Sequence, residues 1–289
     1  MHRELTMRKI LGQIRDEYAY NGHLISLSAV CIVATSAILL NIQLGWQPLL
    51  VTYLITFNGL LYNRYKEQGT DYLTNTRRTV SLKKYFSFIF LIIAISVLSS
   101  VMILVIYKEM NALIFLLVLS FACFLYTKYF KGVTNKIIAF KNIIFSLITS
   151  SLIIFLAIYY SYPLLNFPLF LMLTFVFTRM MVNTIFLDIK DIDSDRKRAL
   201  LTLPVLLGKA KTLKFLRWLT LFSITPILIG CFLGKLPLIS LISIFVIPYS
   251  FYYFAISEKK KNFYLVNYVL ADSEFIFWLG FIVIMKIFI

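Results

Sequence analysis

The chain has 289 residues, of which 60% are hydrophobic, and its formal net charge is +16. So large an apolar share excludes an ordinary water-soluble domain and is typical of integral membrane proteins. The basic residues lie in short segments between long apolar runs, which indicates cytoplasmic loops and argues against a nucleic-acid-binding protein.

Nine apolar runs approach the roughly 20 residues that a helix needs to cross a bilayer. They predict an all-α, polytopic membrane protein, a bundle of nine transmembrane helices in a single domain over residues 1–289. The runs are 24–41, 46–63, 86–107, 110–130, 137–160, 163–187, 213–234, 236–256 and 263–289. The first run follows a charged stretch without secretory signal features, so we expect it to be retained as a span.

The basic residues give this bundle an orientation. With nine spans, all but four of the 29 Lys and Arg residues fall on the side of the N-terminus. The four others are Lys108, Lys235, Lys286 and, inside the sixth run, Arg179. This asymmetry predicts a cytosolic N-terminus, and the two longest loops, 64–85 and 188–212, then also face the cytosol. We expect a prokaryotic plasma membrane, because no transit segment is evident.

Each of these long loops begins with a trio of oxygen-bearing side chains. Asn63, Glu67 and Asp71 are spaced i, i+4, i+8, and on a continuous helix they fall within an arc of about 80°. A second trio, Asp188, Asp191 and Asp195, falls within an arc of about 60° on the same reckoning, whereas Asp193 falls outside it and reads as a solvated charge.

Clustered carboxylates at a membrane edge need partners, and Mg²⁺ favours carboxylate oxygens together with substrate phosphates. The three cysteines are far apart and there are only two histidines, so neither a disulfide framework nor a zinc site is indicated. The trios therefore favour a membrane enzyme that binds Mg²⁺ and the diphosphate of an oily substrate. The alternative is that both are ordinary helix-end charges that face water.

Other charged residues are compatible with a diphosphate site and equally with ordinary charges that face water. Cations near the trios could hold diphosphate oxygens, although cytosolic topology also explains them. They are Arg77, Arg78, Lys128, Lys131 and Lys190. Arg179 lies inside an apolar run and needs a partner, which could be Asp188, Asp272 or Glu274. The last two carboxylates lie inside the ninth run, and a substrate role and a structural ion pair both remain open.

The two trios resemble the motifs of the UbiA superfamily of intramembrane prenyltransferases, NxxxDxxxD after the second helix and DxxDxxxD after the sixth. Asn63, Glu67 and Asp71 match the first, with Glu in place of the middle Asp, and Asp188, Asp191 and Asp195 match the second in full. The segment Thr202-Leu-Pro-Val-Leu-Leu-Gly208 also looks like the family. The chain departs from the pattern at Arg64, where many members have Asp, and at Ala199, near a common glycine.

The resemblance implies Mg²⁺-dependent transfer of a prenyl or polyprenyl group from an allylic diphosphate to a hydrophobic acceptor, by default an aromatic quinone precursor. It implies that six residues hold the metal: Asn63, Glu67, Asp71, Asp188, Asp191 and Asp195. Among these, Asp191 and Asp195 are the expected catalytic carboxylates, and Arg77, Lys131 and Lys190 the expected substrate-binding cations. The expected partners are the two substrates and membrane lipid, without nucleic acid.

Two other functions compete with this interpretation. A terpene cyclase of the same family would use the same metal site without an acceptor. A cation-coupled transporter would place its carboxylates near the middle of the membrane on broken helices, and only Arg179, Asp272 and Glu274 suit that arrangement. Acceptor identity, prenyl chain length and oligomeric state do not follow from the sequence.

Overall fold

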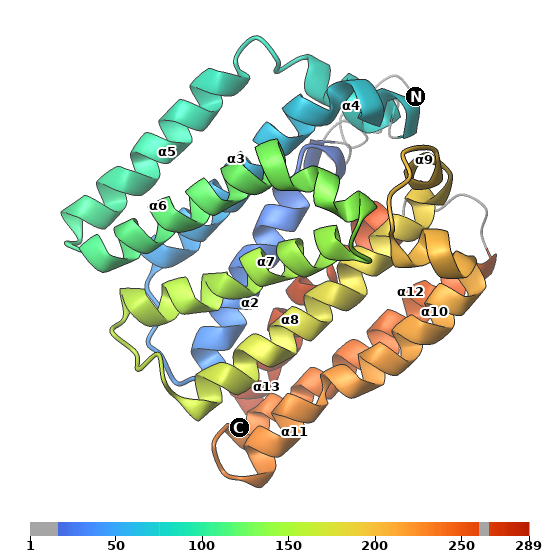
Figure 1. The fold of residues 1–289 in the computed structure, drawn as a ribbon. Coiled ribbons are helices and arrows are strands. Elements are labelled where there is room, and N and C mark those ends of the chain that lie inside the picture. Colours follow the sequence, from blue (N-terminus) through green and yellow to red (C-terminus); the bar gives the residue numbers. More distant parts are fainter. Residues whose placement is uncertain (1–16, 75, 260–265, 289) are drawn as a thin grey trace, which may run out of the picture.

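The fold was obtained as a computed structural model that describes residues 17–74, 76–259 and 266–288 (Figure 1). These described residues form helices and no strand, as expected where lipid offers no hydrogen bonds to the backbone. Within these ranges, the structure describes all side chains except those of Glu67, residues 69–74, residues 76–78 and Lys131. The all-α, polytopic architecture predicted from the sequence is confirmed.

The long helices run roughly along one direction and are joined by short connections (Figure 1). The α-helices of the described residues, long and short, are α2 (His23–Leu39), α3 (Trp46–Thr74), α4 (Thr76–Lys83), α5 (Ile89–Ile106), α6 (Met110–Leu125), α7 (Phe140–Tyr159), α8 (Phe167–Asp188), α9 (Ile192–Lys197), α10 (Leu203–Ser223), α11 (Thr225–Phe232), α12 (Val246–Lys259) and α13 (Glu274–Phe288). Short 3₁₀ or π-helical turns lie between them: η1 (Tyr126–Phe130), η2 (Lys131–Asn135), η3 (Ile189–Asp191), η4 (Leu238–Phe245) and η5 (Val266–Ala271).

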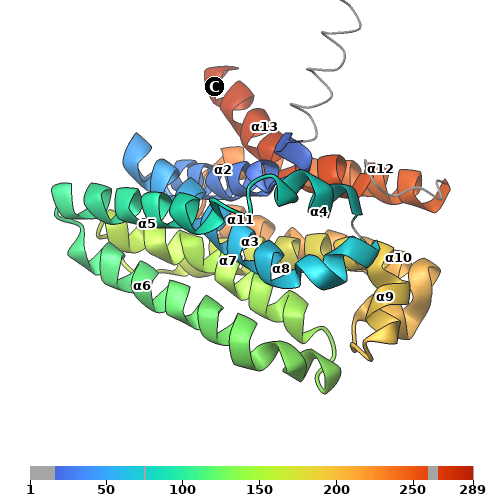
Figure 2. The same ribbon diagram turned by 90° about the horizontal axis from the view of Figure 1, so that it is seen from above.

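The helix α8 lies at the centre of the bundle. It packs against α7, α10 and α11, while α2 packs against α3 and α13. Figure 2 shows α2 and α12 on one side of the bundle and α6 and α7 on the other. The largest buried apolar cluster joins α2, α8, α11 and α13 through side chains such as Ile32, Phe175, Ile227 and Trp278. The second acidic trio begins at the last residue of this central helix, Asp188.

The number of membrane spans is only partly settled by the structure. Each of the nine predicted apolar runs overlaps helical structure. Six helical stretches in the described residues are long and apolar enough to cross a bilayer: Ile89–Ile106, Met110–Phe130, Phe140–Tyr159, Phe167–Lys197, Leu203–Phe232 and Leu238–Lys259. His23–Leu39 is a shorter apolar helix. An integral membrane protein is therefore established, whereas the exact count of nine is not.

The two long segments predicted as loops are largely helical. The helix α3 continues to Thr74, so the three positions of the first trio share one helix, and α4 fills most of the rest of 64–85. The segment 188–212 contains η3, α9 and the beginning of α10, so the prediction that the seventh run begins at 213 was wrong. Pro204 suits the first turn of α10, where its fixed φ is compatible with a helix. Gly208 then interrupts the helix with a φ of 73°, a conformation that glycine adopts readily.

A fully buried ion pair connects α8 to α13. The guanidinium of Arg179 and the carboxylate of Glu274 are both fully buried, and Arg179 Nε donates to Glu274 Oε1 at 2.9 Å. Arg179 Nη2 bonds the same oxygen and also donates to Ser250 Oγ at 2.7 Å. The other carboxylate oxygen accepts a hydrogen bond from the Tyr253 hydroxyl at 2.9 Å. Of the partners that the sequence offered for Arg179, Glu274 is the one observed, so the pair has a structural role.

Replacing Glu274 by Ala should destabilise the bundle strongly, because it leaves a buried guanidinium without its counter-charge. The expected loss is about 3–5 kcal/mol, measured as unfolding in detergent micelles. The matched control is Glu258→Ala, which breaks an exposed pair with Arg217 and should cost at most about 1 kcal/mol. Equal losses in the two variants would show that the Arg179 pair is not a structural centre.

Candidate active site

The second acidic trio surrounds the end of α8, where the chain turns through η3 into α9. Asp195 is fully buried and Asp188 is nearly so, whereas Asp191 is half-buried. Asp193 is exposed, as the sequence predicted for a solvated charge. Buried carboxylates require counter-charges, so the environment of Asp188 and Asp195 defines what this site can bind.

A single lysine bridges the two buried carboxylates. Lys141 Nζ, from the first turn of α7, lies 2.8 Å from Asp188 Oδ1 and 3.1 Å from Asp195 Oδ2. Asn142 Nδ2 donates to the second oxygen of Asp188 at 2.9 Å. Arg198 Nη2 donates to the second oxygen of Asp195 at 2.8 Å. All four carboxylate oxygens therefore have a polar partner, and the cluster alternates positive and negative groups.

Lys141 and Asn142 are the residues that the sequence analysis missed as part of the site. The charge pattern identifies this lysine only as one of many cations on the cytosolic side. A signal was available, since Lys141 lies inside the apolar run 137–160, and a cation in an apolar run requires a partner. The sequence did not show which carboxylates would supply that partner.

Backbone hydrogen bonds hold Lys141 in register with the second trio. Ala139 N donates to Leu201 O at 2.9 Å, and Leu201 N donates to Thr134 O at 3.0 Å. The turn before α7 is thereby paired with the segment after α9. Ala199 in that segment has a φ of 54°, in the left-handed region that favours glycine, which gives a physical reason for the glycine common near this position.

The first trio lies on the described backbone of α3, but only part of it has a described side chain. Asn63 is half-buried, and the side chains of Glu67 and Asp71 lie outside the described part of the structure, as do those of Arg77 and Lys131. The predicted approach of the two trios is therefore untested.

The cations Arg64 and Lys190 next to the trios have observed partners. The buried guanidinium of Arg64 donates to the carbonyl of Tyr20 at 2.7 Å, beside Gly22, whose φ is 99°. Arg64 thus connects α3 to the segment before α2. Lys190 Nζ donates to the Tyr268 hydroxyl at 2.5 Å and lies 4.0 Å from the centre of that ring. This predicted substrate-binding cation is therefore oriented by η5.

The donor chemistry around α8 suits a divalent cation such as Mg²⁺. The described trio residues offer carboxylate and amide oxygens, and each carboxylate oxygen keeps a lone pair beyond its contact with Lys141, Asn142 or Arg198. Among the described residues, no group of three or more His, Cys, Asp or Glu side chains is placed to hold a metal ion. A complete ligand set would therefore need the carboxylates of Glu67 and Asp71.

The carboxylate of Glu17 holds the segment that follows the first trio. It accepts hydrogen bonds from Lys84 Nζ at 2.5 Å and from the Tyr85 hydroxyl at 2.9 Å, just after α4. Burial raises the pKa of Glu17, but hydrogen bonds from Lys84, Asn21 and Tyr85 outweigh this effect and hold the pKa below its ordinary value of 4.5. The contact is therefore made by an ionised carboxylate.

We expect the order of α4 to depend on pH through Glu17. Because its folded pKa is lowered, the stabilisation is complete above pH 4.5 and is lost as the pH falls through the folded value. Hydrogen exchange of the amides of residues 82–85, corrected for intrinsic pH dependence, should show protection that falls in this acid range. In Glu17→Gln the protection should be lower at neutral pH and independent of pH; an unchanged acid transition in this variant would contradict the assignment.

Lys141→Met should destabilise the site by leaving two buried carboxylates without their shared cation. The expected loss is about 3–5 kcal/mol, measured by thermal unfolding in detergent. Lys136→Met is the matched control, because Lys136 is exposed in the turn before α7. Adding Asp188→Asn to Lys141→Met should restore part of the loss, since it removes one uncompensated charge. Equal behaviour of the Lys141 and Lys136 variants would count against the bridge.

Comparison with known proteins agrees with this architecture. The sequence model described as the UbiA prenyltransferase family matches residues 24–266. The fold is similar to the apo structure of a UbiA homologue from Aeropyrum pernix K1, with a TM-score of 0.65, 15% identity, and coverage of 92% of this chain and 98% of that one. It is also similar to a structure reported for digeranylgeranylglyceryl phosphate synthase in membranes, with a TM-score of 0.57, 18% identity, and coverage of 94% and 98%. Comparison with curated proteins gives no match.

Proposed function

The chain belongs to the UbiA prenyltransferase family and is an intramembrane prenyltransferase, and we propose that it transfers a prenyl or polyprenyl group from an allylic diphosphate to a hydrophobic, aromatic acceptor. The observation that carries this proposal is the cluster at the end of α8. There, buried Asp188 and Asp195 alternate with Lys141 and Arg198. Such a cluster suits the binding of an anionic diphosphate. The cations can contact the diphosphate oxygens directly, and the carboxylates can hold a metal ion that also binds them.

Prenyltransferases of this family generally use divalent metal ions to bind the diphosphate. We propose Mg²⁺ as that ion here, because oxygen donors are the ligands it prefers. The residues that would hold it are Asn63, Glu67, Asp71, Asp188, Asp191 and Asp195. When bound, the ion would offset the charge that builds on the departing diphosphate.

Lysine and arginine side chains of the protein would also offset the charge on the diphosphate. Lys141 supplies the positive charge that Asp188 and Asp195 share and holds the two carboxylates in orientation. Lys190, held by Tyr268, offers a positively charged group beside the second trio. We propose that Lys190, with Arg77 and Lys131, contacts diphosphate oxygens as the allylic C–O bond breaks.

The interior of the bundle supports transfer over hydrolysis. As the C–O bond ionises, the allylic carbon becomes electron-deficient, and the electron pair of the bond leaves with the diphosphate. Buried apolar side chains of α8, such as Phe186 and Val182, help to exclude water from the interior of the helix bundle. An electron-rich acceptor ring then forms the new C–C bond and transfers the proton of that ring carbon to the released diphosphate. We propose Asp191 and Asp195 as the catalytic carboxylates of this reaction.

The charge asymmetry of the chain supports an orientation for the site. We propose that both trios face the cytosol of a prokaryotic cell from its plasma membrane, because the basic segments between spans lie at the same end. The substrates would then comprise a cytosolic diphosphate head group and a prenyl chain within the bilayer. We propose that residues 1–289 act as a single domain in this reaction.

The function can be tested with purified protein in nanodiscs. Labelled geranyl, farnesyl and longer prenyl diphosphates are added with Mg²⁺ or EDTA and with a pool of acceptors that includes phenolic acids and a glyceryl phosphate ether. The ether is included because one similar structure is reported for digeranylgeranylglyceryl phosphate synthase. We expect Mg²⁺-dependent diphosphate release together with one prenylated product. Asp191→Asn should reduce this release by about 100-fold or more, through loss of transition-state charge stabilisation.

Asp193→Asn is the matched control, since it makes the same change of charge on an exposed side chain two residues away. It should leave turnover unchanged. Release that yields a hydrocarbon or terpene alcohol without any acceptor adduct would instead identify a cyclase. Absence of diphosphate release with every chain length would overturn the proposed reaction.

A further inference from the structure

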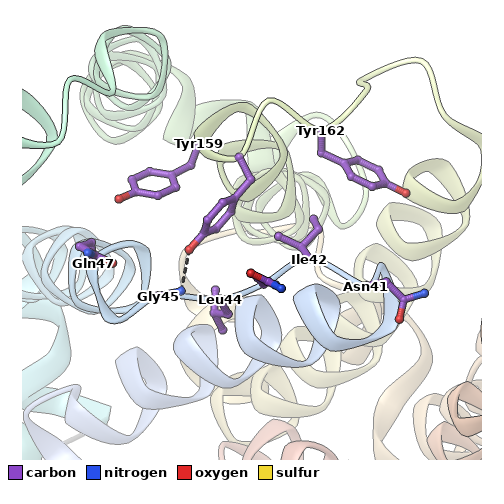
Figure 3. Close-up of a pocket in the computed structure, with 9 residues that line it drawn as sticks. Asn41, Ile42, Leu44, Gly45, Gln47, Tyr159 and Tyr162 are labelled. Carbon is purple, nitrogen blue, oxygen red and sulfur yellow. Dashed lines mark hydrogen bonds between the residues drawn. The ribbon is translucent and has the colours of Figure 1, made fainter.

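A pocket with a mixed polar and apolar lining lies at the end of the bundle opposite the acidic trios. It has a volume of about 630 Å³ and lies between the connection from α2 to α3 and the connection from α7 to α8 (Figure 3). Its polar lining consists of three amides and three phenols: Asn41, Gln43, Gln47, Tyr159, Tyr160 and Tyr162. The 22 residues of α8 separate this end from Asp188, a distance of roughly 33 Å along the helix. The pocket is therefore distinct from the candidate active site.

Hydrogen bonds fix several groups of this lining. The backbone N–H of Gly45 donates to the Tyr160 hydroxyl at 2.7 Å and so joins the two connections (Figure 3). Asn166 Nδ2 donates to the Tyr162 hydroxyl at 3.0 Å. The rings of Tyr159 and Tyr160 pack edge to face with their centres 4.9 Å apart. The phenols are thereby held in place before any ligand binds.

The chemistry of the lining selects an uncharged ligand. No residue that lines the pocket is charged, so neither a phosphate nor an ammonium group would find a counter-charge there. Each amide offers a donor and an acceptor side by side, which matches neighbouring hydroxyl groups. The tyrosine rings add apolar faces against which the C–H face of a sugar can pack. A volume of 630 Å³ falls within the usual range of small-molecule sites.

The surroundings of the pocket favour a lipid as the source of this head group. Trp46 directly follows the α2–α3 connection, is 55% exposed and packs edge to face with Tyr107. Leu165 on the α7–α8 connection and Phe167 at the start of α8 are also exposed. Exposed Trp and Tyr side chains such as Trp46 and Tyr107 are typical of the level of lipid head groups, because their rings are apolar with a polar group. We propose that this pocket binds the uncharged, hydroxyl-bearing head group of a membrane lipid, a glycerol or hexose moiety whose acyl chains lie along the apolar outer surface.

The test uses the full-length protein in phosphatidylcholine nanodiscs that contain a small fraction of monogalactosyl diacylglycerol. Native mass spectrometry measures which lipid the released protein retains. We expect the galactolipid to be retained about 10-fold over its share of the bilayer, which corresponds to about 1.4 kcal/mol of preference. Gln43→Leu and Tyr162→Phe should each abolish this enrichment. Because Gln43 is exposed, its replacement leaves the core untouched.

Two further arms separate the possible ligands. Phe232→Ala, a change at a highly exposed apolar side chain outside the pocket lining, is the matched control and should keep the enrichment. Methyl β-galactoside added to the nanodiscs tests a free sugar and should compete only weakly. Competition as strong as that of the lipid would overturn the assignment to a lipid. Equal retention of the choline lipid, or enrichment that survives in both pocket variants, would overturn the site itself.

Discussion

The low dielectric of the bilayer is the constraint on which the polar parts of this bundle depend, because a charge placed there must have a partner. Two such arrangements are observed, and both involve α8. Arg179 in its middle is neutralised by Glu274 of α13, and Asp188 at its end is neutralised by Lys141 of α7. The central helix is thus tied to two neighbours by charge as well as by packing. Its end is held in one orientation, which is what a site built there requires.

The same constraint shapes the candidate active site. Asp188 and Asp195 lie within reach of one ammonium group, which would otherwise be costly to bury. Because Lys141 contacts both carboxylates, Asp188 and Asp195 can lie close together without a large repulsion between them. The site can therefore concentrate negative charge and remain folded. A diphosphate brings further negative charge and can bind only where positive charge is added. The arrangement therefore couples substrate binding to the balance of charge at the end of α8.

Much of the fold and part of the site could be predicted from the sequence. Apolar runs locate helices because lipid-facing and buried residues are both apolar, and spacing places the positions of the first trio on one helix, α3. The second trio does not share one helix, because the chain passes from α8 through η3 into α9 between Asp188 and Asp195. Lys141 was missed because its role depends on which helices become neighbours, a property of tertiary packing. The partner of Arg179 remained one of three candidates for the same reason. The helical character of segment 188–212 was also missed, because so many charged residues are typical of a loop. In the structure, Pro204 lies in the first turn of α10 and Gly208 forms its kink.

The pairing of Arg179 with Glu274 has a consequence for how the protein is made. The two residues are 95 positions apart in the chain, so α8 enters the membrane well before α13 has been synthesised. During that interval Arg179 has its serine neighbours at most and lacks the carboxylate that neutralises it. Co-translational assembly therefore leaves Arg179 without its counter-charge until α13 enters the membrane. A chain cut short before Glu274 would leave an unneutralised charge in the membrane, a feature by which cellular quality control can distinguish incomplete molecules from finished ones.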